Sequence, residues 1–218
     1  MLVVRRATVG PLQENAYLAA CDVTGEAILV DPGGELARLL ALREPGKFTI
    51  RRIFLTHGHA DHVAAAAAAR EATGAPVTVH EGDEPWLRRF GEHAGFLGLD
   101  REAGPAVDRH HVDGEALRIG EQAGRVIHTP GHSAGGCSLV FPDAKVVFTG
   151  DTLFAGSVGR TDLPGGDLDA LIASIREKLF PLGDDVRFFP GHGPAGTIGE
   201  ERRLNPFAGE PSLRGRWR

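Results

Sequence analysis

Short, largely apolar runs separated by turn residues make up the first 30 positions of the chain. Residues 2–9, 16–21 and 27–30 have the Leu, Val, Ala and Ile content that is typical of β-strands. The stretch 22–25 contains Asp and ends in Gly, which predicts a tight turn between the second and third runs. We expect these three strands to be consecutive antiparallel neighbours.

The pattern then changes to an alternation of helices and strands. Residues 36–43 place apolar side chains at helical spacing, and residues 50–55 form the next strand pattern. The alanine-rich run 64–69 favours a helix, which the Thr-Gly-Ala-Pro sequence at 73–76 ends. Residues 77–80 predict another strand, so this part of the chain indicates an α/β arrangement.

An amphipathic insert and a second set of strands complete the pattern. Residues 84–98 carry aromatic side chains at helical spacing and predict a helical insert, and the polar linker with His110 and His111 predicts no element. The remaining expected elements are strands 115–119, 125–128, 137–141, 146–148 and 186–189, and helix 168–179. We expect a single domain over residues 1–208 and a flexible tail over 209–218.

Composition and charge exclude several classes of partner. The net charge is −5 without long runs of one sign, so neither nucleic acid nor an anionic membrane is an expected partner. The first residues are too short an apolar run for a signal peptide, and no apolar stretch approaches the roughly 18 residues of a membrane span. A cytoplasmic protein is expected. Cys21 and Cys137 are too few for a disulfide framework and are expected to be buried thiols.

One segment concentrates side chains that can bind metal. Thr-His-Gly-His-Ala-Asp-His at positions 56–62 follows the apolar residues 53–55 directly. In extended backbone alternate residues share a face, so His57 and His59 can point the same way. A following helical turn would direct Asp61 and His62 to a second point nearby. The spacing therefore suits two metal ions, with donors that Zn, Fe or Mn accept.

Three further donors follow predicted strands. His132 comes after Thr-Pro-Gly, Asp151 after Phe-Thr-Gly, and His192 after Phe-Pro-Gly. A Gly before each donor lets the backbone turn sharply at the end of the strand. A lone His or Asp at such a place is usually a loop or capping residue. Three of them in the same chain as the 56–62 segment indicate that all these donors belong to one metal centre.

These four motifs together resemble the metallo-β-lactamase superfamily over nearly the whole chain. The resemblance implies an αβ/βα four-layer sandwich, with two mixed sheets face to face and helices outside. It also implies the division of the ligands between two metal ions. The first ion would be held by His57, His59 and His132, the second by Asp61, His62 and His192, and Asp151 would bridge them.

Within the superfamily, the chain resembles small bacterial glyoxalases II, the hydroxyacylglutathione hydrolases. Residues 151–167 and 190–207 carry that resemblance. β-Lactamases commonly have Cys or Ser where this chain has Asp151 or His62, and diiron flavoproteins have Glu in place of His59. These differences argue against both classes. Larger glyoxalases II bind the glutathione carboxylates through a C-terminal helical domain that is absent here. Arg160 is the best substitute for binding an anionic substrate.

The resemblance implies hydrolysis of a small-molecule thioester, S-lactoylglutathione or a related acyl thiol, to acid and thiol through a metal-bridging hydroxide. Two divalent ions are expected, Zn first, with Fe or Mn as alternatives. Asp61 and Asp151 would orient the hydroxide as well as bind metal, and the thiol leaves as an anion without a general acid.

Other functions stay open. A persulfide dioxygenase would use one iron bound by His57, His132 and Asp151. Two more alternatives are a metallohydrolase with another substrate, such as a lactone, and a non-catalytic metal-binding protein. The Gly-Arg-Thr-Asp-Leu-Pro sequence at 159–164 favours the hydrolase. Oligomeric state is not indicated by the sequence.

Overall fold

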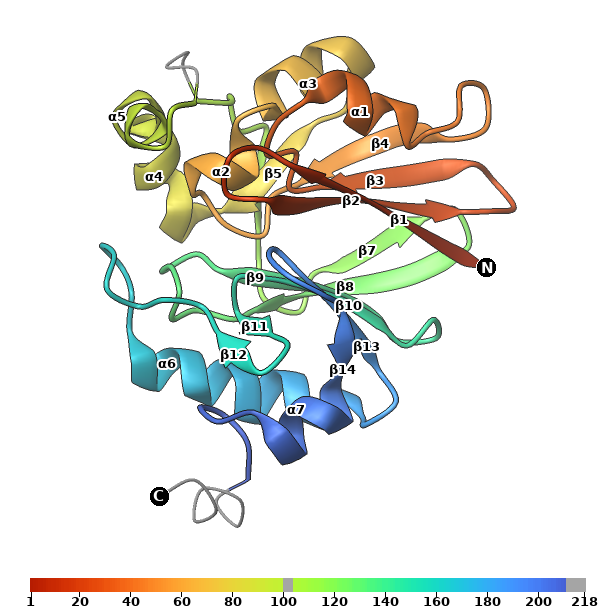
Figure 1. The fold of residues 1–218 in the computed structure, drawn as a ribbon. Coiled ribbons are helices and arrows are strands. Elements are labelled where there is room, and N and C mark those ends of the chain that lie inside the picture. The colour runs from red at the N-terminus through yellow and green to blue at the C-terminus, as the bar shows by residue number, and fades with distance from the viewer. Residues whose placement is uncertain (100–103, 211–218) are drawn as a thin grey trace.

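Two six-stranded sheets pack face to face, with helices on the outer face of each (Figure 1). This computed structural model describes residues 1–99 and 104–210. The four layers confirm the predicted αβ/βα sandwich. The N-terminal half of the chain forms one sheet with its helices, and the C-terminal half forms the other.

The first sheet has the strand order β1-β2-β3-β4-β5-β6. The first three strands are antiparallel neighbours, as predicted, and the last four are parallel. Helices α1 and α3 pack on the outer face, and α3 ends at Gly74 in left-handed backbone. The bounds are β1 Leu2–Val9, β2 Glu14–Cys21, β3 Glu26–Val30, β4 Thr49–Phe54, β5 Val77–His80, β6 Arg109–His111, α1 Leu36–Ala41, α2 Ala60–Val63 and α3 Ala66–Thr73.

Strand β6 corrects the sequence analysis, which treated His110 and His111 as a polar linker. Its three residues pair in parallel with β5. The His111 ring is buried and stacks on Phe54 with ring centroids 4.1 Å apart. Pairing with a neighbouring strand and this aromatic contact therefore outweigh the polar composition of the segment.

The second sheet has the order β14-β13-β10-β9-β8-β7, in which only β10 and β13 pair in parallel. Figure 1 shows α6 and α7 on its outer face. The predicted helix 168–179 is helical throughout but changes to π-helical hydrogen bonding at Ser174. The bounds are β7 Ala116–Ile119, β8 Gln122–His128, β9 Cys137–Phe141, β10 Val146–Gly150, β13 Arg187–Pro190, β14 Gly196–Thr197, α6 Leu168–Ala173, η2 Ser174–Leu179, η3 Phe180–Leu182 and α7 Ile198–Leu204.

Strand β2 shows how the layers are held together. Tyr17 and Ala19 enter the core between the sheets, whereas Leu18 and Ala20 enter the core under α1 and α3. Alternate residues of a strand point to opposite faces, so residues 16–20 of β2, which enter the two cores, are apolar apart from the Tyr17 hydroxyl, whereas Glu14 and Asn15 at the start of the strand are polar. All eight residues of β2 are buried.

The predicted insert folds as two short helices, α4 (Glu84–Arg88) and α5 (Phe90–Phe96), after the 3₁₀ turn η1 (Glu81–Asp83). A small hairpin of β11 (Leu153–Phe154) and β12 (Ser157–Val158) lies beside the second sheet.

The remaining predictions concern the tail, the thiols and membrane spans. The predicted tail from residue 211 onward lies outside the described residues, and Gly209 donates a backbone hydrogen bond to Asn205. Both cysteines are free and buried. Among the residues described, no helix has the length and apolar character needed to cross a membrane.

Candidate metal centre

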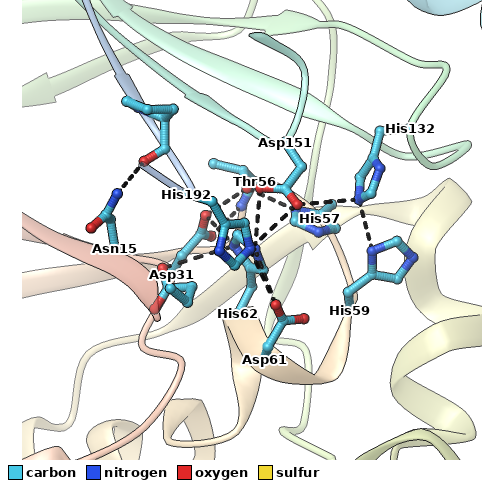
Figure 2. Close-up of polar contacts among 12 residues, drawn as sticks. Asn15, Asp31, Thr56, His57, His59, Asp61, His62, His132, Asp151 and His192 are labelled. Atoms are coloured by element: carbon cyan, nitrogen blue, oxygen red, sulfur yellow. Dashed lines mark hydrogen bonds and ion pairs between the residues drawn. The ribbon is translucent and has the colours of Figure 1, made fainter. Parts of the chain in front are cut away.

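The predicted donors meet where four strands end at one edge of the two sheets. The segment after β4 supplies His57 to His62, and the segments after β8, β10 and β13 supply one donor each. Figure 2 shows these side chains pointing toward one another. Residues up to 135 positions apart, His57 and His192, therefore share one small volume. The seven donors are His57, His59, Asp61, His62, His132, Asp151 and His192.

Three histidines form the first group. One ring nitrogen from each of His57, His59 and His132 lies within 4.8 Å of the other two. His132 Nε2 is 2.8 Å from His59 Nδ1. His132 Nδ1 donates to the carbonyl oxygen of Arg160 at 2.8 Å, so its Nε2 presents a lone pair toward His59.

The second group consists of Asp61, His62 and His192, whose donor atoms also lie within 4.8 Å of one another. His62 Nε2 and His192 Nε2 are 3.4 Å apart. His62 Nδ1 donates to Asp31 and His192 Nδ1 donates to the Leu12 carbonyl, so both Nε2 atoms present lone pairs to each other. Two facing lone pairs need a proton or a cation between them.

Asp151 lies between the groups. Its Oδ1 is 3.3 Å from His62 Nε2, and its Oδ2 is 3.6 Å from both His132 Nε2 and His192 Nε2. One carboxylate therefore contacts histidines of both groups.

Two glycines allow this convergence. A Cβ on Gly191 would lie 2.2 Å from Asp151 Oδ1 and 2.5 Å from His62 Cε1. Gly131, before His132, has a φ of 130°, and a Cβ there would meet the backbone of Leu171. Position 191 requires glycine because the side chains of Asp151 and His62 lie too close for a Cβ. Position 131 requires it because of the close backbone of Leu171 and because of its own positive φ.

A buried network behind the histidines was not predicted from the sequence. Asp31, directly after β3, accepts hydrogen bonds from the backbone N–H and the hydroxyl of Thr56 at 2.7 and 2.6 Å and from His62 Nδ1 at 3.0 Å. Because the Thr56 hydroxyl donates to Asp31, it accepts from His57 Nδ1 at 3.0 Å. The network fixes His57 and His62 with their Nε2 atoms facing the centre. Asp31 shows the same signal as Asp151, a carboxylate at a strand end.

Asp83 was also missed, and it joins two of the metal-binding loops. Its Oδ2 accepts from the backbone N–H of Gly58 at 2.9 Å and from the Ser133 hydroxyl at 2.7 Å, and its Oδ1 accepts from the Gly135 N–H at 2.6 Å. The sequence holds no signal for this role, because the three partners come from distant segments.

A further buried acid lies under His62. Glu14 is fully buried, its Oε1 is 3.9 Å from His62 Nδ1, and within the described residues its carboxyl oxygens have no hydrogen-bond partner. Burial raises the pKa of Glu14 well above its usual value, which favours the uncharged acid.

The charge states fit cation binding. Burial lowers the pKa of His57 well below its usual value and that of His59 to about 3, so both rings are neutral at pH 7. Burial alone would raise the pKa of Asp151, but His62 outweighs it and lowers that pKa strongly. The Nε2 atom of His57 is buried and has no hydrogen-bond partner among the described residues. A buried polar atom without a partner is costly, and a metal ion would satisfy it.

A cavity of about 620 Å³ opens over the centre. His59, Asp61, His132, Asp151 and His192 form its polar floor, and Trp86 lies against His59 with ring centroids 4.3 Å apart. Arg160 also lines the cavity, but its guanidinium makes two 2.7 Å hydrogen bonds to Asp162. Arg160 contacts the predicted metal ligands through its backbone carbonyl oxygen, which accepts the hydrogen bond from His132 Nδ1.

The sequence and the fold both match one protein family. The model of the metallo-β-lactamase superfamily matches residues 9–192, and the chain belongs to that superfamily. Among curated relatives, hydroxyacylglutathione hydrolase GloC of Haemophilus influenzae is 39% identical over 206 residues, which cover 94% of this chain and 97% of the relative.

Three solved structures show the same fold. BLEG-1, described as a B3 metallo-β-lactamase, has a TM-score of 0.85 at 37% identity and covers 94% of this chain and 99% of its own. TTHA1623 in a di-iron-bound form has a TM-score of 0.83 at 42% identity, with 93% and 99% covered. ETHE1 from Myxococcus xanthus has a TM-score of 0.79 at 29% identity, with 94% and 84% covered.

Proposed function

We propose that this protein is a metallohydrolase that cleaves acyl thioesters, S-lactoylglutathione or a related acyl thiol, to acid and thiol. The observation that carries the proposal is the position of Asp151, whose two oxygens face histidines of both donor groups. A dinuclear centre needs such a shared ligand. The similarity to a hydroxyacylglutathione hydrolase supports the thioester class.

In this proposal the donors are divided between two ions as the resemblance to the superfamily implies. His57, His59 and His132 would hold one divalent ion, Asp61, His62 and His192 the other, and Asp151 would contact both. Zn is the first candidate, and the di-iron form of TTHA1623 supports Fe as an alternative. Such ions supply a water nucleophile at neutral pH and stabilise negative charge on a carbonyl oxygen.

The residues of the chain have separate tasks in this reaction. Asp61 and Asp151, whose carboxylates lie at the cavity floor, would orient the attacking water. Asp31 and Thr56 hold the rings of His62 and His57 in the required tautomer. A thiol with a pKa of about 8.5 leaves as an anion, so no general acid is assigned.

Persulfide dioxygenase activity is the second candidate, because ETHE1 is similar over 94% of this chain. It would use one iron bound by His57, His132 and Asp151. Lactonase activity is a third candidate within the superfamily. BLEG-1, described as a B3 metallo-β-lactamase, brings β-lactams into the same test, although Asp151 and His62 stand where β-lactamases commonly have Cys or Ser. A small-molecule substrate without nucleic-acid or membrane partners, and a cytoplasmic location, stay predictions from the sequence.

The test combines metal analysis with assays under controlled oxygen. Purified protein of known metal content is given S-lactoylglutathione without oxygen, then glutathione persulfide with an oxygen electrode, then a lactone and a β-lactam. Thioester cleavage by protein with about two metal equivalents is the expected result. One iron per chain with oxygen uptake on the persulfide, and no thioester cleavage, would replace the hydrolase with the dioxygenase.

A further inference from the structure

The cavity over the candidate metal centre has a polar floor but apolar walls. Leaving aside the five donors on the floor, twelve residues line it, and nine of those are apolar. The largest are Leu12, Trp86, Phe96, Leu97, Phe154 and Leu163. Walls of this kind bind an apolar group by removing it from water.

The walls reach both donor groups. The Trp86 ring lies 4.3 Å from the ring of His59 in the first group, and the Phe154 ring lies 6.1 Å from that of His192 in the second. Leu12 is fixed beside the second group, because its carbonyl accepts from His192 Nδ1. A carbonyl group placed at the centre therefore has apolar surface on either side.

Two apolar wall residues are exposed to solvent. Phe96 is 90% exposed and Leu12 is 46% exposed. Neither contributes to the core of the protein, so each would gain from contact with an apolar ligand.

The charges in the cavity do not favour a ligand with several carboxylates. Among the described residues that line it, Arg160 is the one arginine and there is no lysine. The Arg160 guanidinium is already paired with Asp162. The thiol arm of glutathione carries two carboxylates, and among the described residues that line the cavity no unpaired Arg or Lys side chain would meet them as they leave water.

We propose that the substrate is a thioester with an apolar acyl chain of several carbons on a thiol arm without carboxylates. This inference rests on the proposed thioester hydrolysis and narrows its substrate class. Trp86, Phe96 and Phe154 would cover the acyl chain while Asp61 and Asp151 orient the water. Each methylene group that is fully buried strengthens binding about fourfold.

The experiment measures kcat/KM on metal-quantified protein with acetyl, butanoyl, hexanoyl and octanoyl thioesters of N-acetylcysteamine, and with lactoyl and hexanoyl thioesters of glutathione. We expect kcat/KM to rise about tenfold or more from acetyl to hexanoyl on the same arm. We also expect the hexanoyl group to be cleaved at least as well on N-acetylcysteamine as on glutathione.

The two levels of the proposal fail differently. If metal-loaded protein cleaves none of these thioesters, the proposed function is wrong. If it cleaves them with no dependence on chain length, prefers lactoyl to hexanoyl on glutathione, or needs the glutathione arm, only the substrate class is overturned.

Variants locate the effect in the wall. Phe96→Ser should lower the hexanoyl-to-acetyl ratio of kcat/KM at least threefold. A ratio within one preparation does not depend on the fraction of active protein. The matched control is Leu204→Ser, which changes a leucine that is 71% exposed on α7 and does not line the cavity, and should leave the ratio unchanged. An unchanged ratio in Phe96→Ser would remove Phe96 from the acyl site.

Discussion

Asp83 accepts a hydrogen bond from the backbone N–H of Gly58, the residue between the first two histidines of the metal-binding segment, at 2.9 Å. The same carboxylate holds Ser133, next to His132. Two loops that supply the first donor group are thus joined through one buried side chain. Its role is to position the donors, since it belongs to neither group.

Asp83→Asn tests this role. The amide replaces one acceptor with an N–H, which would face donors from Gly58, Ser133 or Gly135. We expect a stability loss of about 1–3 kcal/mol and a 10- to 100-fold weaker affinity for the first metal ion. Thermal unfolding and chelator competition measure the two effects. Asp185→Asn is the control, because Asp185 is 64% exposed and paired only with Lys145 among described residues.

Asp31→Asn tests the network behind His62. Asp31 has left-handed backbone with φ 47°, which Asn tolerates, so the fold should survive. The variant loses the carboxylate that accepts from both His62 and Thr56, and we expect about 10- to 100-fold weaker binding of the second ion. Chelator competition that resolves a tight and a weak ion measures this. Equal affinities in variant and wild type would show that Asp31 has only a structural role.

Asp151→Ala tests the dinuclear proposal. Because Asp151 contacts histidines of both groups, its removal should lower the metal content from about two equivalents to one or none and reduce kcat at least a hundredfold. Metal analysis after gel filtration gives the stoichiometry. Asp162→Ala, an exposed carboxylate outside both groups, should keep two equivalents. If Asp151→Ala retains two ions, the proposal that Asp151 is a ligand shared by both ions is wrong.

The sequence predicted the strand-end donors because each one follows an apolar run directly, and the end of a strand fixes where its next side chain goes. Asp31 obeys the same rule, but Asp-Pro-Gly is also typical of a turn, so its sequence alone does not separate the two roles. Asp83 lies beyond β5 in a 3₁₀ turn, and its partners are 25 to 52 residues away. Contacts at such separation leave no local pattern. The three-residue β6 likewise depends on its pairing with β5 and on the Phe54 contact.

Arg160→Ala tests whether this side chain binds a substrate anion, as the sequence predicted. Its guanidinium is paired with Asp162, and its carbonyl, which any residue supplies, accepts from His132. We expect less than a threefold change in KM for S-lactoylglutathione. Asp162→Asn frees the guanidinium and should lower KM for anionic thioesters. A tenfold or greater rise in KM for Arg160→Ala, with kcat unchanged, would instead assign anion binding to Arg160.

The two metal ions should differ in their dependence on pH. Burial alone would lower the pKa of His62, but Asp151 and Asp61 outweigh it and raise that pKa well above its usual value. Burial also opposes the effect of Asp61 on His192, whose pKa is nevertheless raised. An ion at the second group must therefore compete with a proton for the Nε2 atoms of His62 and His192, and each proton that it displaces weakens its binding about tenfold for every unit by which the pH falls.

His57 and His59 of the first group behave in the opposite way, because burial lowers the pKa of both rings. The pKa of His59 is about 3 because of burial, so its ring is free of protons throughout the range from pH 5 to 8. Lowering the pH from 8 to 5.5 should therefore release the second ion and leave about one equivalent bound at the first group. Competition with a chelator of known affinity at each pH, followed by metal analysis, measures both steps. If both ions are lost in parallel over that range, the prediction is wrong. Competition with protons on His62 and His192 would then not explain the release of the second ion.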